Sequence, residues 1–422
     1  MKIALLGGMV NNMYLLTKAL RRLNYNAFYI RDPLDTFMLH QPFWLDTYGQ
    51  FSPSDIKKYS SFSQWKEFEE KIGWKKEPYL IDPLDITSIK PAPSPQINSQ
   101  LTRYFFFRRY NRTLEWKKIQ STIKGFDLLI SCGVHSILNA RLSGKPYYIW
   151  SHGGDIRYLL GLEGETTGFL NKIYHYATIN MLRDAFNSAE GILLNDPTSI
   201  YTDGTPSVTK TKQKLIHKNI TSLPLPSFIP PPSSEKDSPL PSDKINILIP
   251  SRFDLKWKQQ DIFLKGLAKS KNKNLYRVTI LSWGKNANLI QKYIHNLGLG
   301  SVVKIVGQVF TKPMLLKFYK KHDIVVDQFG IGTFGSICME ALSVNVPVMI
   351  YIDEAAFKHS PEMIPPVLNA RNVDDVTIQL NSIAEDKDKL VELRRNIKKW
   401  YIKNLGDIAF QKRFQNILGD KL

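Results

Sequence analysis

One segment of the chain combines residue types that can bind a nucleoside diphosphate. In DQFGIGTFGSICMEALSVNVPVMI, residues 327–350, a strand ending at Asp327 is followed by a glycine-rich loop. A helix is expected to begin near Ser336, with Glu340 about one turn inside it. The amides at a helix start attract anions, and loop glycines let a phosphate approach the backbone. A carboxylate at that position can accept hydrogen bonds from ribose hydroxyls. The alternative is an ordinary strand–turn–helix unit with Glu340 on a solvated face.

A glycine pair also follows the first predicted strand. KIALLG leads into Gly7 and Gly8, and the turn LLGGMVNNM lacks the GxGxxG pattern. Dinucleotide binding through that fingerprint is therefore not supported. Two glycines at the carboxyl end of a parallel strand still allow close approach of a ligand to the backbone.

Elements that would position these loops alternate along the N-terminal half. The first strand, a helix over residues 12–23 and a second strand at NAFYI form the start of a βαβ unit. Later strands are expected at FDLLISCG (126–133), KPYYIWS (145–151) and EGILLNDP (190–197). Polar residues follow these strands, where open α/β sheets place ligands.

The C-terminal half shows a more regular βα succession after a proline-rich segment. Residues 221–242 are rich in Pro and Ser, which suits an extended crossover between domains. INILIPSRF then begins a second alternation of strands and helices. We therefore expect an N-terminal Rossmann-like domain (1–222), a linker (223–242), a C-terminal Rossmann-like domain (243–395) and a helical segment (396–422) that packs back on the N-terminal domain.

Length and composition agree with two folded domains. A chain of 422 residues exceeds the size of one ordinary core, and 43% of its residues are hydrophobic. Cys132 and Cys338 are too few for a disulfide framework, which fits buried packing thiols in a reducing compartment. We read the apolar N-terminus as a strand and not as a signal peptide, and expect no spanning helix. The net charge of +19 favours anionic partners or reflects well-solvated lysines.

The segment 327–350 resembles the donor site of the large retaining GT-B glycosyltransferase family numbered four, the glycosyl transferases group 1. That family carries Glu-Gly-Phe-Gly, a short apolar stretch, Glu-Ala and then Pro-Val. Here Phe334-Gly335 matches the Phe-Gly, Glu340-Ala341 the Glu-Ala and Pro347-Val348 the Pro-Val. The resemblance implies two Rossmann-like domains facing across a cleft, with the donor held by Phe334, Gly335, Ser336 and Glu340.

The resemblance also assigns two cations in PSRFDLKWKQQD, residues 250–261. The family places an Arg and a Lys here that hold the diphosphate leaving group. Arg252 matches the Arg; the Lys is Lys256 or Lys258, and the Lys-x-x-Asp context favours Lys258. Fixed cations would stabilise the charge that develops as the diphosphate departs. Solvated surface cations are the alternative.

Two loops of the N-terminal half match more weakly. In SHGGDIR, residues 151–157, His152 matches a family His in an HG-type loop and is expected to contact the transferred sugar or the acceptor. A structural histidine is the alternative. Gly7 and Gly8 match the loop at which the family's N-terminal domain approaches the donor or acceptor.

One position departs from the family pattern. Gly332 stands where the first Glu of the motif contacts the transferred sugar, so the sugar's identity stays open. Asp327 is the candidate for a substitute carboxylate. The resemblance implies retention by same-face attack without a protein nucleophile, and we expect no metal and no cofactor because a helix terminus and protein cations take the metal's role.

A basic and aromatic stretch, RYFFFRRYNRTLEWKK (103–118), is the segment that most suggests a binding partner. If this stretch forms a helix, its aromatic and basic side chains would suit an anionic membrane surface, and a lipid-linked acceptor would then be expected. The alternative interpretation is an ordinary amphipathic helix whose aromatic residues belong to the core. We expect a cytoplasmic glycosyltransferase, hexosyltransferase-like, that uses a nucleotide sugar and a glycan or lipid-linked acceptor and binds no nucleic acid. Two alternatives stay open: a GT-B relative such as a nucleotide-sugar epimerase, and a non-catalytic basic protein that binds membrane or polyanion.

Overall fold

The computed structural model describes residues 1–8, 11–33, 35, 37–55, 62–85, 114–152, 154–159, 169–194, 220–224, 243–357 and 360–419. The chain divides into two compact units. The first unit consists of Met1–Trp44, Tyr59–Leu225 and Gln411–Leu422, and the second of Leu45–Lys58 and Pro226–Phe410.

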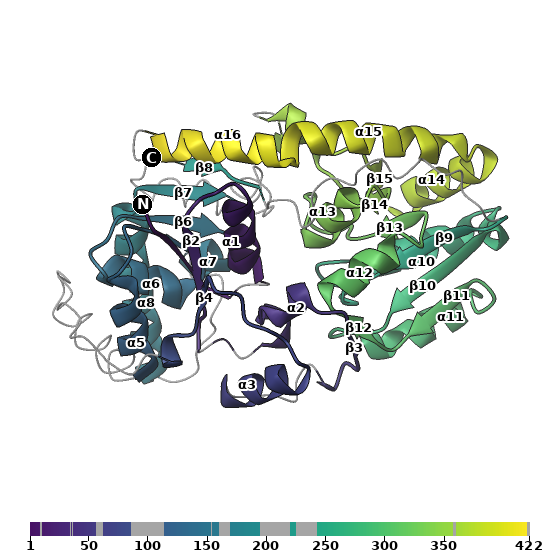
Figure 1. The fold of residues 1–422 in the computed structure, drawn as a ribbon. Coiled ribbons are helices and arrows are strands. Elements are labelled where there is room, and N and C mark those ends of the chain that lie inside the picture. The colour runs from purple at the N-terminus through teal and green to yellow at the C-terminus, as the bar shows by residue number, and fades with distance from the viewer. Residues whose placement is uncertain are drawn as a thin grey trace. The chain divides into compact units, whose positions relative to one another are not determined.

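In the part of the first unit that is described, a seven-stranded parallel sheet has the order β4-β2-β1-β5-β6-β7-β8 (Figure 1). Its strands are β1 (Ile3–Leu6), β2 (Ala27–Ile30), β4 (Leu80–Ile81), β5 (Leu128–Ser131), β6 (Tyr147–Ser151), β7 (Gly191–Leu194) and β8 (Ile220–Ser222). Its helices are α1 (Asn12–Arg22), α3 (Phe62–Lys71), α5 (Leu114–Ile123), α6 (Val134–Leu142), α7 (Gly154–Leu159) and α8 (Phe169–Ser188).

The first unit is held together by apolar strands that helices cover. Every residue of β1, β5, β6 and β7 is buried, as expected for parallel strands covered on both faces. Side chains of α5, α6 and α8 form one core with the sheet, among them Trp116, Leu138 and Phe186. This packing brings the loops after β1, β2, β4, β5 and β6 to one edge of the sheet, because the strands are parallel.

The second unit contains, among its described residues, a six-stranded parallel sheet in the order β11-β10-β9-β13-β14-β15. Its strands are β9 (Ile245–Ile249), β10 (Tyr276–Leu281), β11 (Val303–Val306), β13 (Ile324–Val326), β14 (Val348–Ile350) and β15 (Leu368–Asn369). Its helices are α10 (Gln260–Lys269), α11 (Ile290–Asn296), α12 (Lys312–Tyr319), α13 (Ser336–Ser343), α14 (Val373–Glu385) and α15 (Asp388–Leu405). Two further helices, α2 (Phe43–Asp46) and α16 (Asp407–Leu418), continue from one unit into the other.

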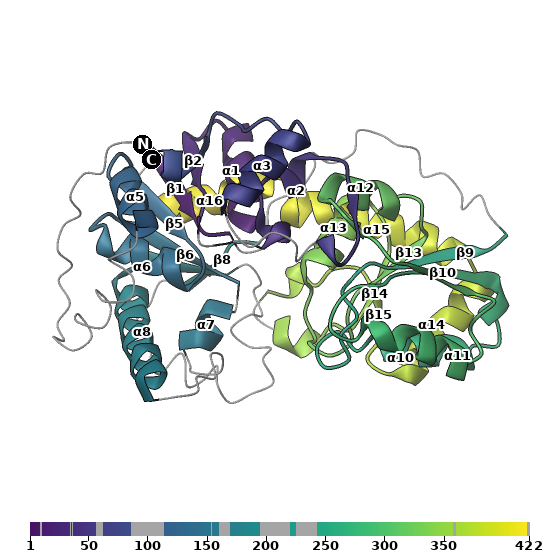
Figure 2. The same ribbon diagram turned by 90° about the horizontal axis from the view of Figure 1, so that it is seen from below.

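Two cores lie on opposite faces of this second sheet. Helices α10, α11 and α14 bury Phe263, Ile294 and Leu380 against one face, and Figure 2 shows these helices grouped on one side of the strands. Helices α12, α13 and α15 bury side chains such as Leu316 and Leu342 against the other face. The loop before α13 is therefore fixed between a buried strand, β13, and a buried helix.

A short segment from the N-terminal half belongs to the second unit. β3 (Gln50–Phe51) pairs antiparallel with β12 (Val309–Phe310), and the amide of Thr311 donates to the carbonyl of Gly49 over 2.9 Å. The Thr311 hydroxyl is the acceptor for the amide of Gly49 at 2.8 Å. Residues 49–51 are thus anchored beside the start of α12.

The fold agrees with the sequence-based expectation. Two parallel Rossmann-like sheets are present, the initial apolar residues form strand β1, and α13 begins at Ser336 as predicted. Cys132 and Cys338 are both buried free thiols, and burial raises the pKa of Cys338. In the described segments, no helix is long and apolar enough to cross a membrane.

Candidate functional site

Lys258 lies at the carboxyl edge of the second sheet, next to the end of β13. Its Nζ donates to Asp327 Oδ1 at 2.6 Å and to Gln328 Oε1 at 2.8 Å. Asp327 is completely buried, whereas the Lys258 side chain is 16% exposed. An ammonium has three donors, so two contacts fix this cation and leave one N–H for a ligand.

The loop that carries Lys258 is built by two side chains. Gln260 Nε2 donates to the carbonyl of Arg252 at 2.7 Å and to Ser251 Oγ at 2.9 Å. Asp254 Oδ1 accepts the amides of Lys256 and Trp257, both at 3.0 Å. These contacts turn the chain sharply between β9 and α10, so the loop is fixed before any ligand binds.

Gly335 lies between the Lys258–Asp327 pair and the start of α13. It is the N-cap residue of α13 and has no side chain to cap the helix, so the first amides of α13 lack an intrahelical partner. A Cβ at Gly335 would lie 3.8 Å from Asp327 Oδ2 and 3.9 Å from Lys258 Nζ. The predicted residues Lys258, Asp327 and Gly335 are therefore neighbours, and together they offer a cation and helix amides to an anion.

The rest of the loop forms a support for the helix start. Phe334 is buried and packs its ring against Phe357 at 5.8 Å between centroids. Gly332 has a φ of +77°, and a Cβ there would lie 3.1 Å from both Asp353 Cβ and Tyr351 Cε1. The position of the family's first Glu is thus a tight, left-handed turn, which glycine adopts without strain. Ser336, the first residue of α13, is half-buried.

Glu340 is fully buried and faces α12. Its Oε2 accepts the Tyr319 hydroxyl at 3.0 Å, and its Oε1 accepts from Lys312 Nζ. Burial, with the Glu340 charge as a second cause, raises the pKa of Tyr319. The Lys312 side chain is 12% exposed and that of Glu340 is 0% exposed, so a ligand that approaches from solvent meets the lysine first.

Arg252 and Lys256 differ from Lys258 in how they are held. The Arg252 side chain is 53% exposed and its Nε lies 3.7 Å from Asp254 Oδ2, a loose contact. Lys256 Nζ lies over the Trp257 ring, 5.3 Å from its centroid. Of the two lysines that the sequence leaves open, Lys258 is the one beside Asp327 and the start of α13.

The predicted residues of the N-terminal half lie at the carboxyl edge of the first sheet. His152 follows β6, and its Nδ1 faces Asn12 Nδ2 at 3.2 Å. Since an amide nitrogen only donates, the Nδ1 atom accepts and Nε2 carries the proton in a neutral ring. Burial lowers the pKa of His152 to about 3, and its buried Nε2 has no hydrogen-bond partner within the described structure. His152 is thus a neutral donor.

Glycines 7 and 8 leave room that other side chains use. A Cβ at Gly7, whose φ is +116°, would lie 2.2 Å from the carbonyl oxygen of Cys132. A Cβ at Gly8 would lie 2.1 Å from Asp35 Oδ2. Gly8 is therefore required by a carboxylate of the neighbouring loop, a reason that its sequence context does not reveal.

Sequence reasoning missed several polar residues at these two edges. Gln328 connects Lys258 to the glycine-rich loop, because its Nε2 donates to the carbonyl of Thr333 at 2.6 Å. Lys312 and Tyr319 hold Glu340 from a different helix, and Asp35 contacts His40 in the first unit. Of these residues, only Gln328 could have been suspected from the sequence, since it directly follows Asp327.

Two expectations concern residues or groups that the structure does not test. Residues 103–113 of the predicted membrane segment 103–118 lie outside the described residues, whereas Trp116 in α5 is buried in the core. No group of three His, Cys, Asp or Glu side chains in the described ranges could hold a metal ion. The expectation of metal-independent chemistry stays a prediction.

Comparison with known proteins bears on this geometry. Residues 232–400 match the family of glycosyl transferases group 1. The resemblance to the glycosyl transferases group 1 is therefore confirmed for this part of the chain, which holds Arg252, Lys258, Gly335 and Glu340. No curated protein matches the chain in sequence.

Solved structures show the same fold along the whole chain. HepE (Alr3699) from Anabaena, in complex with UDP and glucose, has a TM-score of 0.60 at 13% identity over 99% of each chain. Sucrose-phosphate synthase from Thermosynechococcus elongatus has a TM-score of 0.59 at 14% identity over 99% of this chain and 98% of that one. The lipopolysaccharide outer core galactosyltransferase WaaB has a TM-score of 0.54 at 16% identity over 100% of both chains. These likenesses show the GT-B fold, and with the family match they support glycosyl transfer in general.

Proposed function

We propose that this chain is a retaining glycosyltransferase that moves a sugar from a nucleotide-sugar donor to a glycan or lipid-linked acceptor. One observation carries the proposal: Lys258, positioned by Asp327 and Gln328, lies beside the uncapped start of α13 within the segment that matches the glycosyl transferases group 1. Retention is implied by the resemblance to the family numbered four. The UDP and UDP-glucose complexes of HepE make UDP the first nucleotide to test.

In this proposal the second sheet's edge binds the donor diphosphate. The free N–H of Lys258 and the first amides of α13 would contact phosphate oxygens, with Gly335 allowing their approach. Arg252, which is 53% exposed, would add a mobile cation. These groups stabilise negative charge as the glycosyl bond to the diphosphate breaks, a role that metal ions fill in other enzymes. We therefore propose metal-independent transfer without a cofactor.

The ribose would be recognised by Glu340 together with Lys312. Both oxygens of Glu340 have protein partners, but a carboxylate accepts about four hydrogen bonds. A direct ribose contact therefore requires Lys312 to move aside, since Glu340 is 0% exposed. The Glu340–Lys312 pair, and not the carboxylate alone, is the proposed ribose site.

The proposal extends to the protein's location and its acceptor. A cytoplasmic location fits two free buried cysteines. Peripheral binding to an anionic membrane through residues 103–118 would bring a lipid-linked acceptor within reach. His152, a neutral donor at the edge of the first sheet, would hydrogen-bond the transferred sugar or the acceptor.

The test is calorimetric titration of the full chain with UDP, GDP, ADP and their sugars. One nucleotide should bind, and Arg252→Ala should weaken binding at least about tenfold, since charge-assisted hydrogen bonds are worth about 1.5–3 kcal/mol. Arg277→Ala, at an exposed position of β10, is the matched control and should bind as wild type does. Glu340→Ala should also lose binding, with circular dichroism to confirm the fold. Absence of binding by every nucleotide would overturn the proposal in favour of a non-catalytic basic protein.

A further inference from the structure

A second polar centre lies in the first unit, on the loop that follows β2. His40 Nδ1 lies 2.7 Å from Asp35 Oδ2, and the two side chains are 21% and 22% exposed. His40 ends a short 3-10 helix, η2 (Met38–His40), and Asp35 contacts Gly8 at the end of β1. This pair therefore lies at the carboxyl edge of the first sheet, where open α/β sheets bind ligands.

The contact with Asp35 sets what His40 can offer. An ionised carboxylate only accepts, so the Nδ1 atom of His40 carries a proton and, in the neutral ring, Nε2 has the free lone pair. His152 has the opposite arrangement, with the proton on Nε2. Of the two histidines, His40, which is 21% exposed, is therefore the one whose accepting nitrogen suits a ligand hydroxyl group.

Phe37 adds an apolar surface beside His40. Its side chain is 45% exposed, and its ring meets the imidazole edge-to-face with 5.0 Å between centroids. The amide of Phe37 donates to Asp35 Oδ1 at 3.2 Å, so the aromatic ring and the Asp35–His40 pair are held by one turn of chain. An exposed aromatic face next to a hydroxyl-binding nitrogen matches the mixed apolar and polar surface of a sugar ring.

A buried cluster of charged residues holds the loop 35–41 in place. Arg31, 1% exposed, donates to Glu69 at 2.8 and 3.1 Å, lies 3.6 Å from Asp82, and donates its Nε to Gln41 Oε1 at 3.0 Å. Because Gln41 Oε1 accepts from the Arg31 guanidinium, the amide nitrogen Nε2 of Gln41 points away from Arg31. That nitrogen donates to the carbonyls of Asp35 at 2.8 Å and Phe37 at 3.2 Å.

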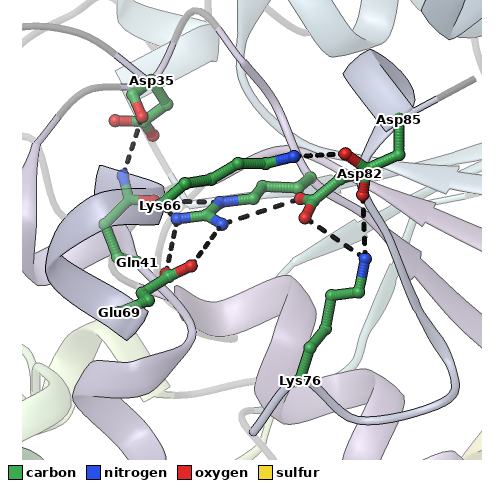
Figure 3. Close-up of polar contacts among 8 residues, drawn as sticks. Asp35, Gln41, Lys66, Glu69, Lys76, Asp82 and Asp85 are labelled. Atoms are coloured by element: carbon green, nitrogen blue, oxygen red, sulfur yellow. Dashed lines mark hydrogen bonds and ion pairs between the residues drawn. The ribbon is translucent and has the colours of Figure 1, made fainter. Parts of the chain in front are cut away.

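Figure 3 shows how the cluster continues, with Gln41 reaching toward Asp35 on one side and Lys66 and Lys76 contacting Asp85 and Asp82 on the other. Asn11 Nδ2 completes the loop by donating to the carbonyls of Leu39 at 2.7 Å and Gln41 at 2.9 Å. Its neighbour Asn12 contacts His152. Consecutive residues therefore hold both histidine environments, and the loop geometry exists before a ligand binds.

We propose that Asp35, Phe37 and His40 form a subsite for one sugar ring of a carbohydrate acceptor. His40 Nε2 accepts a hydrogen bond from a sugar hydroxyl, and Phe37 packs against the ring's C–H face. Asp35 is a positioning residue that acts through His40, and Arg31 acts through Gln41. The inference rests on the proposed function, because an acceptor is needed only if the chain transfers sugar.

The test measures binding without a donor, so that it is independent of nucleotide recognition. Saturation-transfer NMR of the full chain with methyl glycosides of glucose, galactose, mannose and N-acetylglucosamine should show binding of at least one. His40→Leu and Phe37→Ala should each weaken that binding at least about fivefold, and His40→Gln should retain part of it because an amide oxygen still accepts.

Two matched controls lie on α8 of the same unit. His175→Leu removes another half-buried histidine, which contacts Tyr158 at 3.0 Å, and Tyr176→Ala removes another exposed aromatic side chain, 68% exposed. Both should bind the glycoside as wild type does. The subsite is overturned if no glycoside binds while a nucleotide does, or if binding is equal in His40→Leu, Phe37→Ala and wild type. Loss of nucleotide binding as well would overturn the proposed function itself.

Discussion

Each sheet has cations just after the carboxyl ends of its strands, but the cations of the first sheet are buried and those of the second are partly exposed. In the first unit Arg31 is 1% exposed and its guanidinium contacts Gln41, Glu69 and Asp82. In the second unit Arg252 is 53% exposed, and Lys258 keeps 16% exposure while Asp327 and Gln328 hold it. Residue type alone therefore does not identify a ligand-binding cation: the first arginine organises a loop, and the second group stays accessible to solvent.

The comparison also separates two kinds of preorganisation. Around Lys258, one carboxylate and one amide fix a cation that keeps a free donor. Around Arg31, buried partners surround the guanidinium, and one of them, Gln41, connects it to the Asp35 loop. Removing Arg31 should therefore damage the fold of the first unit, whereas removing Lys258 should damage ligand binding as well as stability.

The largest effect is expected for Arg31→Met. This change leaves Glu69 and Asp82, 7% and 4% exposed, without their buried cation. Breaking a buried pair from one side lowers the free energy of unfolding by about 3–5 kcal/mol. Urea unfolding would measure this, and hydrogen exchange should show faster exchange of amides in residues 35–41.

A matched control uses an exposed pair of the same unit. Arg141→Met breaks the contact between Arg141 and Asp184, whose side chains are 29% and 53% exposed. Its expected loss is below about 1 kcal/mol because solvent screens such pairs. Equal losses in the two variants would show that the Arg31 cluster is not the buried anchor of the loop.

Lys258→Met should have the next largest effect on stability. Asp327 would then be a buried carboxylate whose Oδ2 already lacks a hydrogen-bond partner among the described residues. The expected loss is about 2–3 kcal/mol, less than for Arg31, because Lys258 is 16% exposed against 1% for Arg31 and the start of α13 favours a negative charge.

The double variant Lys258→Met/Asp327→Leu separates the two roles of Lys258. It should recover stability, since no buried charge is left unpaired, but nucleotide binding in calorimetry should stay lost. Recovery of both stability and binding would mean that Lys258 only neutralises Asp327. Recovery of neither would mean that the loop depends on other contacts of this pair.

The contrast between the edges explains what the sequence could predict. The second site comes largely from one strand–loop–helix segment, so glycines and the helix start could be recognised, and α13 begins at the predicted Ser336. The partners of Glu340 are 28 and 21 residues away on α12, and nothing in the local pattern indicates that Lys312 and Tyr319 enclose it.

In the first unit, several important contacts join residues that lie far apart in the sequence. Arg31 and Glu69 are 38 positions apart, and Asn12 and His152 are 140 apart. In the second unit, the pairing of β3 with β12 is accompanied by a contact across 262 positions, between Gly49 and Thr311. The fold class could be anticipated from the alternation of strands and helices, but these side-chain clusters depend on the completed sheet.

A pH prediction tests whether His152 is as buried as its partner contact indicates. Its pKa is lowered to about 3 in the folded chain, against about 6.5 when unfolded. Between these values the unfolded chain binds more protons, so the free energy of unfolding falls as pH falls below about 6.5. The contribution is at most about 1.4 kcal/mol per pH unit. His152→Gln should show a flatter decrease between pH 7 and pH 5.

His295→Gln is the control for this pH effect, because His295 is exposed on α11. It should leave the slope of unfolding free energy against pH as in wild type. An unchanged slope in His152→Gln would instead mean that water reaches the ring, which would remove the argument for a neutral donor at the first edge.

The smallest effect on stability is expected for Gly335→Ala, which tests whether the start of α13 binds the diphosphate. The φ of Gly335 is −108°, and a Cβ would contact Asp327 Oδ2 and Lys258 Nζ at ordinary distances of 3.8 and 3.9 Å. The free energy of unfolding should change by less than about 0.5 kcal/mol. The added methyl group nevertheless occupies the space between the lysine and the helix amides, so nucleotide affinity should fall about tenfold, or about 1.4 kcal/mol. Calorimetry beside urea unfolding would separate the two quantities. A variant that binds nucleotide as wild type does would place the diphosphate away from the start of α13, and Arg252 would then have to bind it with other groups.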